Sequence, residues 1–304
     1  MTECERIIQT GFVSDEFLAE EVRDEYTVTE TTKKVWLIEM DLLREFVRVC
    51  DKFGFRYWLA FGSLLGAIRH KGMIPWDDDL DVWMPREDYE KLLSLPSSEF
   101  AAPYFLQTTL NDNDYYNAFA RLRNSNTTGI LVSGKNKCNN GIYLDIIPLD
   151  GMSEKDSVSK FRFKAAHVQN VIAHAYIYNV NPSIITRTIH KVLHFPLCRY
   201  SLSKTYQRVN KIASKTKWED TDCVGITVYR AYAFEKIKFN KADFENSVLV
   251  PFEHMMVAVP AGYDNVLRTL YGDYMKFPPV EKRGNWHHFV FEPDVPYIEY
   301  EYVK

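Results

Sequence analysis

Four aspartates stand within five positions in residues 61–85, FGSLLGAIRHKGMIPWDDDLDVWMP. Like charges this close repel one another and destabilise a folded chain unless something compensates them. Solvent can do so, and so can a divalent cation. The aspartates are interleaved with Trp76, Leu80, Val82 and Trp83, so the segment is amphipathic and half buried. A bound cation therefore explains the pattern better than a solvated acidic turn.

Prolines near both ends of residues 74–85 indicate that this segment is an extended strand. Side chains two positions apart on a strand share a face. We therefore expect Asp77, Asp79 and Asp81 to point together and Asp78 to point away. Three carboxylates on one face suit Mg²⁺, which prefers oxygen ligands, with Mn²⁺ as a substitute.

A calcium-binding EF-hand loop also begins Asp-x-Asp-x-Asp, but it needs glycine at its sixth position and glutamate at its twelfth. Those positions hold Val82 and Asp88 here. Pro75, just upstream, would also break an entering helix. The EF-hand reading is rejected.

The residues before the aspartates form a compact phosphate-binding unit. A buried strand over 57–61 is expected to end in a tight turn at Gly62 and Ser63, which starts a short helix. Backbone N–H groups at a helix N-terminus, together with the Ser63 hydroxyl, can hold a phosphate. Arg69 and Lys71 add positive charge. Such an arrangement suits phosphoryl transfer, where catalysis is mainly positioning and charge neutralisation.

Composition and length narrow the class of protein. The chain has 304 residues and a formal net charge of −4, so no global basicity points to a nucleic-acid partner. Its five cysteines are odd in number and contain no CxxC pair, which favours a reducing compartment. We find no signal-length apolar run at the N-terminus and no window of roughly 18 apolar residues. The expected location is the cytosol or the inner face of a membrane.

The span between Asp156 and Glu219 contains no acidic residue, yet it holds eleven Lys or Arg. Its pattern is mostly helical. Such a block can contact an anionic membrane peripherally. The alternative is a solvated helical face that balances the acidic first half, and the sequence leaves both open.

Several motifs resemble one family. Gly62-Ser63 followed by Asp79-x-Asp81 resembles the nucleotidyltransferase superfamily that includes DNA polymerase beta. More narrowly, GSLLGAIRHKGMIPWDDDLDV resembles the LicD family of phosphocholine transferases, relatives of fukutin and the fukutin-related protein. Three further stretches agree: FARLRNSNTT, GIYLDIIPLDG and YGDYMKFPPVEKRGNWHH. Residues 160–250 match only loosely.

The resemblance implies a third carboxylate on a later strand, which maps to Asp145. An aspartate among Tyr143, Leu144 and Ile146 would be buried and would need a partner. In the superfamily this carboxylate also helps to deprotonate the attacking hydroxyl. Asp150, followed by glycine, is interpreted as a turn residue. The expected metal ligands are Asp77, Asp79, Asp81 and Asp145, and the expected catalytic residues are Asp79, Asp81 and Asp145.

Substrate contacts are expected at Gly62, Ser63, Arg69, Lys71, Arg121, Arg123 and His287. Two of these, Arg121 and Arg123, lie two apart on a predicted strand, so they share a face that could bind a diphosphate. Surface arginines on an edge strand are the alternative. The neighbouring pair His287 and His288 would point opposite ways, which argues against one shared metal.

The predicted fold is α/β in the broad sense, of the α+β kind. We expect a nucleotidyltransferase-like mixed sheet, largely antiparallel, flanked by helices and carrying a helical insertion. The predicted parts are an N-terminal arm at 1–28, a catalytic core at 29–154, a basic helical insertion at 155–235 and a C-terminal part at 236–304 that completes the substrate site.

The implied reaction moves a phosphoalcohol, with phosphocholine the first expectation, from a CDP-alcohol such as CDP-choline to a sugar hydroxyl, releasing CMP. The implied acceptor is a cell-surface glycan or lipid-linked glycan, as in lipopolysaccharide, teichoic acid or capsule. Trp58, Trp76 and Trp83 are the candidate walls for a quaternary ammonium group. Two alternatives stay open: a nucleotidyltransferase that moves NMP from an NTP, and an inactive glycan-precursor-binding protein.

Overall fold

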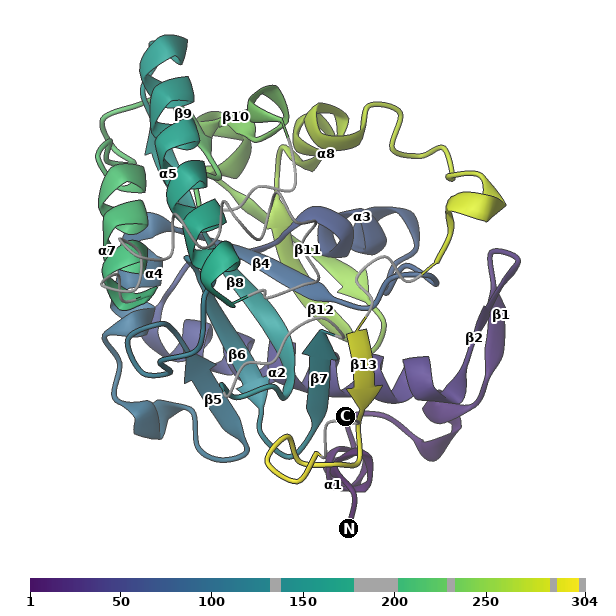
Figure 1. Ribbon diagram of the computed structural model, residues 1–304. Helices are drawn as coiled ribbons and strands as arrows, with labels where there is room; N and C mark the ends of the chain where they lie inside the picture. The colour runs from purple at the N-terminus through teal and green to yellow at the C-terminus, as the bar shows by residue number, and fades with distance from the viewer. Residues whose placement is uncertain (132–137, 178–201, 229–232, 285–288, 301–304) are drawn as a thin grey trace, which may run out of the picture.

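The computed structural model describes residues 1–131, 138–177, 202–228, 233–284 and 289–300, and all structural statements below concern these residues (Figure 1). Their central feature is a sheet of seven strands. Five strands form its main path, in the order β10 (Lys238–Asn240), β9 (Cys223–Gly225), β8 (Ile142–Met152), β4 (Leu80–Pro85) and β3 (Trp58–Leu59). β6 (Ala120–Asn124) pairs with the first half of β8, and β5 (Tyr104–Gln107) pairs with β6.

One strand pair of this sheet, β4 with β8, is parallel, and the other described pairs are antiparallel. The predicted mixed, largely antiparallel sheet is therefore confirmed. β8 is the longest strand and is buried along its whole length. Strands pair with both of its edges, so β8 sets the register of β4, β6 and β9 relative to one another.

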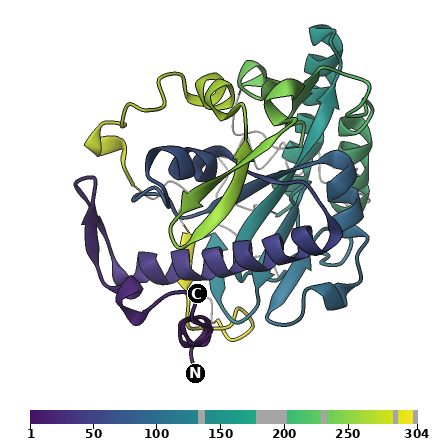
Figure 2. The same ribbon diagram turned by 180° about the vertical axis from the view of Figure 1, so that it is seen from behind.

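A long helix, α2 (Glu30–Phe53), lies across the back of the sheet (Figure 2). Thr29 caps its N-terminus by accepting a hydrogen bond from the Thr32 N–H, and Gly54 ends it in the left-handed conformation. Its apolar face, which includes Trp36 and Met40, is fully buried.

Shorter elements surround this core. The remaining α-helices outside the insertion are α1 (Glu3–Gln9), α3 (Phe61–Arg69), α4 (Arg86–Leu93) and α8 (Tyr263–Tyr271). Three two-stranded sheets pair β1 (Glu21–Arg23) with β2 (Tyr26–Val28), β11 (Ser247–Phe252) with β12 (Met255–Pro260), and β7 (Thr128–Leu131) with β13 (Phe289–Glu292). Short 3₁₀ turns are Asp15–Leu18, Ser97–Glu99, Phe234–Lys236, Lys241–Phe244 and Val280–Lys282.

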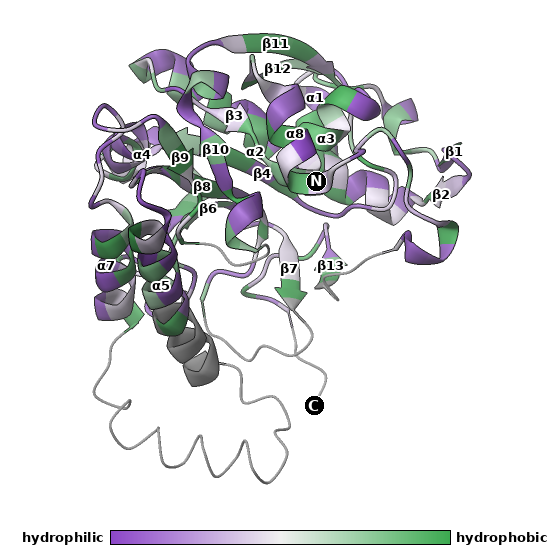
Figure 3. Ribbon diagram, turned by 90° about the horizontal axis from the view of Figure 1, so that it is seen from above, coloured by the Kyte–Doolittle hydropathy of each residue, from purple (hydrophilic) through white to green (hydrophobic). Residues whose placement is uncertain are grey.

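In the parts of the basic segment that the structure describes, two helices, α5 (Asp156–Ile177) and α7 (Leu202–Ala213), lie side by side at one edge of the molecule (Figure 3). Two buried contacts attach α7 to α4. Arg86 Nη1 donates to Asn210 Oδ1 at 2.6 Å, and the hydroxyls of Tyr89 and Tyr206 are 3.2 Å apart. Among the described residues, none of the helices is both long enough and apolar enough to cross a membrane.

Three local predictions were wrong. The strand expected over 74–85 begins only at Leu80, and β3 contains two residues rather than five. Gly62 and Ser63 lie inside the first turn of α3 and do not precede it. In each case a helix or loop replaces part of the predicted strand, because short apolar runs do not distinguish strand from helix.

The turn predicted at Asp150 was also wrong. Asp150 lies within β8, opposite Gly225 of β9, and is fully buried. Gly151 serves a close approach there, because a Cβ atom would lie 2.6 Å from the backbone oxygens of Thr216 and Lys217.

Candidate active site

Asp81 and Asp145 are direct neighbours on the parallel strands β4 and β8. Both are nearly inaccessible to solvent. They are 64 positions apart in the chain, so the sheet register alone brings them together. The prediction that residue 145 joins the aspartates of the 77–81 segment thus has the required geometry.

Arg121 lies on β6 opposite Asp145, on the other side of β8. Its Nε donates to Asp145 Oδ1 at 2.5 Å and its Nη2 to Oδ2 at 3.2 Å. The guanidinium also lies over the Tyr143 ring, 3.7 Å from the ring centre. This planar, two-point contact fixes the orientation of the Asp145 carboxylate.

Arg123 shares a face with Arg121, as predicted, because both guanidinium groups contact the ring of Tyr143. It is 3% exposed and donates to Gln107 Oε1 and to the Gly141 carbonyl. β6 lies between β5 and β8, so the alternative of surface arginines on an edge strand is wrong. Contact of either arginine with a diphosphate stays a prediction.

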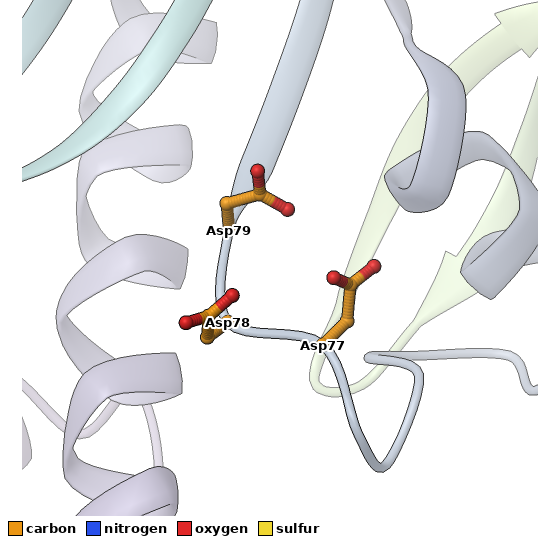
Figure 4. Close-up of side chains that lie close together, drawn as sticks. All are labelled: Asp77, Asp78 and Asp79. Atoms are coloured by element: carbon orange, nitrogen blue, oxygen red, sulfur yellow. The ribbon is translucent and has the colours of Figure 1, made fainter. Parts of the chain in front are cut away.

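The loop that leads into β4 holds Asp77, Asp78 and Asp79. One carboxylate oxygen from each lies within 4.8 Å of the other two (Figure 4). The indole Nε1 of Trp36, on α2, donates to the Asp77 carbonyl at 3.1 Å and holds this loop. The expectation that Asp78 points away was wrong, since these residues precede the strand and strand alternation does not apply to them.

The surplus of negative charge acts on the ionisation of Asp81. The pKa of Asp81 is raised well above its usual range, first by burial and then by Asp79, Asp145 and Asp77, against which Arg121 acts. Ionised carboxylates this close need a compensating cation. Their hard oxygen atoms fit a divalent cation such as Mg²⁺. Of the four predicted ligands, Asp77 and Asp79 lie in one oxygen cluster, and Asp81 and Asp145 lie beside each other on the sheet.

Glu39 is a site residue that the sequence reasoning missed. It lies on α2, is 1% exposed, and its Oε2 has no hydrogen-bond partner in the described part of the chain. Burial first, and then the charges of Asp79, Asp78, Asp77 and Asp81, raise its pKa well above the ordinary value. A glutamate three residues after Trp36, at the spacing of the apolar face of a helix, was the available signal.

Gly62 and Ser63 hold the start of α3 against the aspartates. Ser63 is 4% exposed, and its Oγ accepts a hydrogen bond from the Asp81 N–H at 2.8 Å. At Gly62 a Cβ atom would lie 2.5 Å from Asp77 Oδ2, so only glycine leaves room for that carboxylate. The pair therefore positions Asp77 and Asp81, and its contact with a phosphate stays a prediction.

A cavity of about 430 Å³ opens beside Asp77. Its walls are α3, the loop 74–77 and the segment 271–278 that follows α8, with Gly62, Leu65, Arg69, Ile74, Trp76, Asp77, Tyr271, Asp273, Tyr274, Lys276 and Pro278 as lining residues. The cavity thus joins the aspartate loop to a segment about 200 positions later in the chain.

The structure separates the two basic residues predicted upstream of the aspartates. Arg69 lines the cavity, where it donates to the Tyr274 carbonyl at 2.8 Å and lies over the ring of Phe277. Lys71 is exposed and is not among the lining residues. Lys276, which the motif reasoning did not single out, lines the cavity with Arg69.

Among the three tryptophans predicted as walls for a quaternary ammonium, Trp58 and Trp83 are buried in the core, 1% and 0% exposed, against Phe244. They cannot reach a ligand, so this part of the prediction was wrong. Trp76 does line the cavity, but the guanidinium of Arg283 lies 4.8 Å from its ring centre. His287 lies outside the described residues.

Comparison with known proteins bears on this arrangement. Residues 54–181 match the family described as LicD/FKTN/FKRP, nucleotidyltransferase domain. This chain carries a LicD-family domain. The resemblance drawn from the sequence motifs is thereby confirmed, and the mixed sheet flanked by helices agrees with a nucleotidyltransferase-like fold.

Named relatives extend the LicD-family match. Lipopolysaccharide cholinephosphotransferase LicD of Haemophilus influenzae is 26% identical over 268 residues, which cover 84% of this chain and 96% of that protein. Ribitol 5-phosphate transferase FKRP of Homo sapiens is 46% identical over 56 residues, 18% of this chain and 11% of that protein. Mannosyltransferase regulator 4 of Saccharomyces cerevisiae is 30% identical over 119 residues, 37% of this chain and 10% of that protein.

The LicD-family domain contains the aspartate loop, Asp81, Arg121 and Asp145, but it ends before the cavity wall at 271–278. That wall is therefore assigned from the structure.

Proposed function

We propose that this chain transfers a phosphoalcohol, phosphocholine in the first instance, from its CDP derivative to a sugar hydroxyl of a cell-surface glycan. CMP is the leaving group. Two observations carry the proposal: the carboxylate cluster of Asp77 to Asp79 beside a cavity, and the neighbouring pair Asp81 and Asp145 on the adjoining strands, with all of these aspartates within the region that matches the LicD family. The full-length similarity to the Haemophilus influenzae cholinephosphotransferase supports the choice of alcohol and of glycan acceptor.

Mg²⁺, or Mn²⁺ in its place, would be held by Asp77, Asp79, Asp81 and Asp145 and would neutralise charge on the donor diphosphate. The chain's own residues do the remaining work. Ser63 fixes the backbone of Asp81, and Arg121 fixes the carboxylate of Asp145. These contacts set the direction from which a diphosphate approaches, and such positioning is the main source of rate in phosphoryl transfer.

The sugar hydroxyl attacks the phosphorus of the phosphoalcohol in line, and the bond to the CMP oxygen breaks. The proton of the hydroxyl passes to a carboxylate oxygen of the Asp81–Asp145 pair. Arg69, at the cavity wall, lies where it can take up charge on the leaving phosphate. The exposed Lys71 has no such place, so the proposal assigns that role to Arg69.

A donor screen tests this proposal. The full chain is incubated with Mg²⁺, a glycan-bearing envelope fraction of the organism that encodes it, and each of CDP-choline, CDP-ethanolamine, CDP-glycerol and CDP-ribitol. We expect CMP release with one donor and label transfer to glycan, both lost in Asp79→Ala. NTPs are the parallel arm, because pyrophosphate release from them would instead indicate a nucleotidyltransferase.

Absence of turnover on every donor and every NTP would contradict the proposal. If Mg²⁺ still bound to the chain, that result would favour the inactive glycan-precursor-binding protein. The four carboxylates, of which Asp81 and Asp145 are buried, argue against that alternative, since a binding protein has no need for an acidic cluster that destabilises it.

We also propose that the basic helices α5 and α7 place the enzyme at the cytoplasmic face of an anionic membrane, near a lipid-linked acceptor. Lys160, Lys164 and Lys211 are among the cationic residues of these helices. Flotation with phosphatidylglycerol vesicles should occur at low salt and weaken as salt rises. Flotation that ignores salt, or none at low salt, would contradict this placement.

A further inference from the structure

The cavity beside Asp77 adjoins the acidic cluster of Asp77, Asp78 and Asp79. Asp77 contributes to the acidic cluster and also lines the cavity. A phosphate bound at the cluster therefore has one of its substituents inside the cavity. In a CDP-alcohol that substituent is either the alcohol or the cytidine, and the properties of the cavity decide between them.

Size and the state of the aromatic lining both disfavour the alcohol. The volume of about 430 Å³ falls in the range of pockets that hold drug-sized ligands, and a choline group would leave most of it empty. The charges of the lining do not discriminate, because Arg69 and Lys276 are matched by Asp77 and Asp273. The aromatic face of Trp76, which a quaternary ammonium would need, is already covered by the guanidinium of Arg283.

The same cavity suits a nucleotide. Arg69 and Lys276 can pair with a phosphate, and Tyr271 supplies an aromatic wall for a base. Asp273 contributes a carboxylate to the lining, outside the acidic cluster. An ionised carboxylate only accepts hydrogen bonds, so it pairs with the exocyclic amine of cytosine and repels the O4 of uracil.

We propose that this cavity binds the CMP half of the donor, and that Asp273 selects cytosine by accepting a hydrogen bond from its exocyclic amine. The proposal rests on the proposed function, because it assumes a CDP-linked donor. It adds the location of the nucleotide, a phosphate contact from Lys276 and a specificity residue on the 271–278 segment. Lys276 and Asp273 both lie outside the region that matches the family domain.

Product binding tests the proposal without turnover. CMP and UMP are titrated into the full chain by calorimetry, with MgCl₂ and again with EDTA. We expect CMP to bind about tenfold more tightly than UMP, which corresponds to one hydrogen bond to a charged group. Asp273→Asn should bring the two affinities to within a few-fold, because the amide can donate to O4 of uracil. Asp51→Asn, at an exposed aspartate that does not line the cavity, is the matched control.

The phosphate contact has its own variant. Lys276→Gln should weaken CMP and UMP by a similar factor and leave the weak binding of cytidine unchanged. Lys282→Gln, another exposed lysine of the C-terminal segment that is not among the lining residues, should change neither. Both target side chains are exposed, so these variants should fold, and a thermal melt confirms it.

Three results would overturn the inference. One is absence of CMP binding in MgCl₂. Another is Asp273→Asn weakening CMP and UMP equally, or changing neither. The third is displacement of CMP by choline chloride at the same site, which would place the alcohol in the cavity. Turnover of CDP-choline with an unchanged CMP to UMP ratio in Asp273→Asn would defeat this inference alone. Selective CMP binding with no turnover of any CDP-alcohol would defeat the proposed function alone.

Discussion

Two aspartates on the same strand, Asp145 and Asp150 of β8, are each held by one arginine in nearly the same way. Arg121 contacts Asp145 through Nε and Nη2 at 2.5 and 3.2 Å. Arg86 contacts Asp150 through the same two nitrogens at 2.7 and 3.2 Å. All four side chains are nearly inaccessible to solvent. As isolated ion pairs, the two cannot be told apart.

Their surroundings differ. Arg86 also donates to Asn210 and Glu90, so the pair on Asp150 is enclosed by groups that satisfy it. Burial raises the pKa of Asp150, and Arg86 opposes that rise. Asp145 instead adjoins Asp81, whose pKa is raised by burial, by Asp79, by Asp145 itself and by Asp77. A buried pair is weak evidence of function, whereas carboxylates in excess of their cations indicate a site for an added cation.

The largest expected effect is a difference in activity between a variant of Asp81, the neighbour of Asp145, and a variant of Asp150. Asp81→Asn should lower CMP release from CDP-choline by about 10³-fold, since a metal ligand supplies several kcal/mol of charge stabilisation. Its melting temperature in EDTA should stay the same or rise, because one repelling carboxylate is gone. Asp150→Asn should keep its turnover below the melting temperature. Normal turnover in Asp81→Asn would end the metal assignment.

The second-largest expected effect is a difference in unfolding free energy between variants of the two arginines. Arg86→Met leaves Asp150 buried and unpaired, which should lower the free energy of unfolding by about 3–5 kcal/mol, with or without Mg²⁺. Arg121→Met should cost a similar amount in EDTA, but Mg²⁺ should recover part of it, since the cation can compensate Asp145. Denaturant unfolding with MgCl₂ and with EDTA measures both. Equal recovery of stability by Mg²⁺ in the two variants would mean that Asp145 is no closer to a cation site than Asp150 is.

The comparison of Asp145 with Asp150 also shows which parts of the fold and of the site could be predicted from the sequence. Motifs with local spacing, such as Gly62 followed by Asp79 and Asp81, led to the acidic site, and the family resemblance added Asp145. Trp36 and Met40 follow the spacing of one buried helix face, but only packing reveals that Glu39 lies beside the aspartate loop. The turn predicted at Asp150 rested on the glycine that follows it, but Asp150 pairs with Gly225 of β9 and lies within a strand.

The cavity wall was beyond local reasoning for another reason. Arg69 and Lys276 are about 200 positions apart, and they meet because the segment after α8 lies over α3. Nothing in the spacing of either motif encodes that contact. Likewise, the burial of Trp58 and Trp83 follows from the placement of Phe244, a residue that no motif includes.

A smaller effect concerns how Asp77 is held. Gly62→Ala places a methyl group where Asp77 Oδ2 now lies, so that carboxylate must move. We expect Mg²⁺ affinity to fall by about tenfold, the equivalent of one weakened ligand contact, with little change in the melting temperature. Gly284→Ala, where a Cβ atom meets nothing within 4 Å, is the matched control. Unchanged Mg²⁺ affinity in Gly62→Ala would remove Asp77 from the ligand set.

The smallest expected effect is a change in the pH dependence of folding stability, which tests whether Glu39 belongs to the group of carboxylates around Asp81 and Asp145. Its pKa in the folded chain is raised well above the unfolded value near 4.5, first by burial and then by the aspartates. A folded state that keeps a proton the unfolded state has lost becomes less stable as pH rises. The stability that Glu39 contributes is therefore complete below pH 4.5 and is lost as the pH rises towards its folded pKa.

Glu39→Gln removes that titration and keeps the shape, and its amide can donate to the nearby carboxylates. In EDTA the variant should match the wild type below pH 4.5 and exceed it by about 1 kcal/mol at neutral pH, where the wild type leaves a buried carboxylate unsatisfied. Urea unfolding across this pH range measures the difference. Mg²⁺ should narrow it, because a cation in the cluster offsets the repulsion that Glu39 experiences. A difference that is constant with pH would mean that Glu39 is an ordinary buried side chain, and the surplus charge would then lie in the aspartates alone.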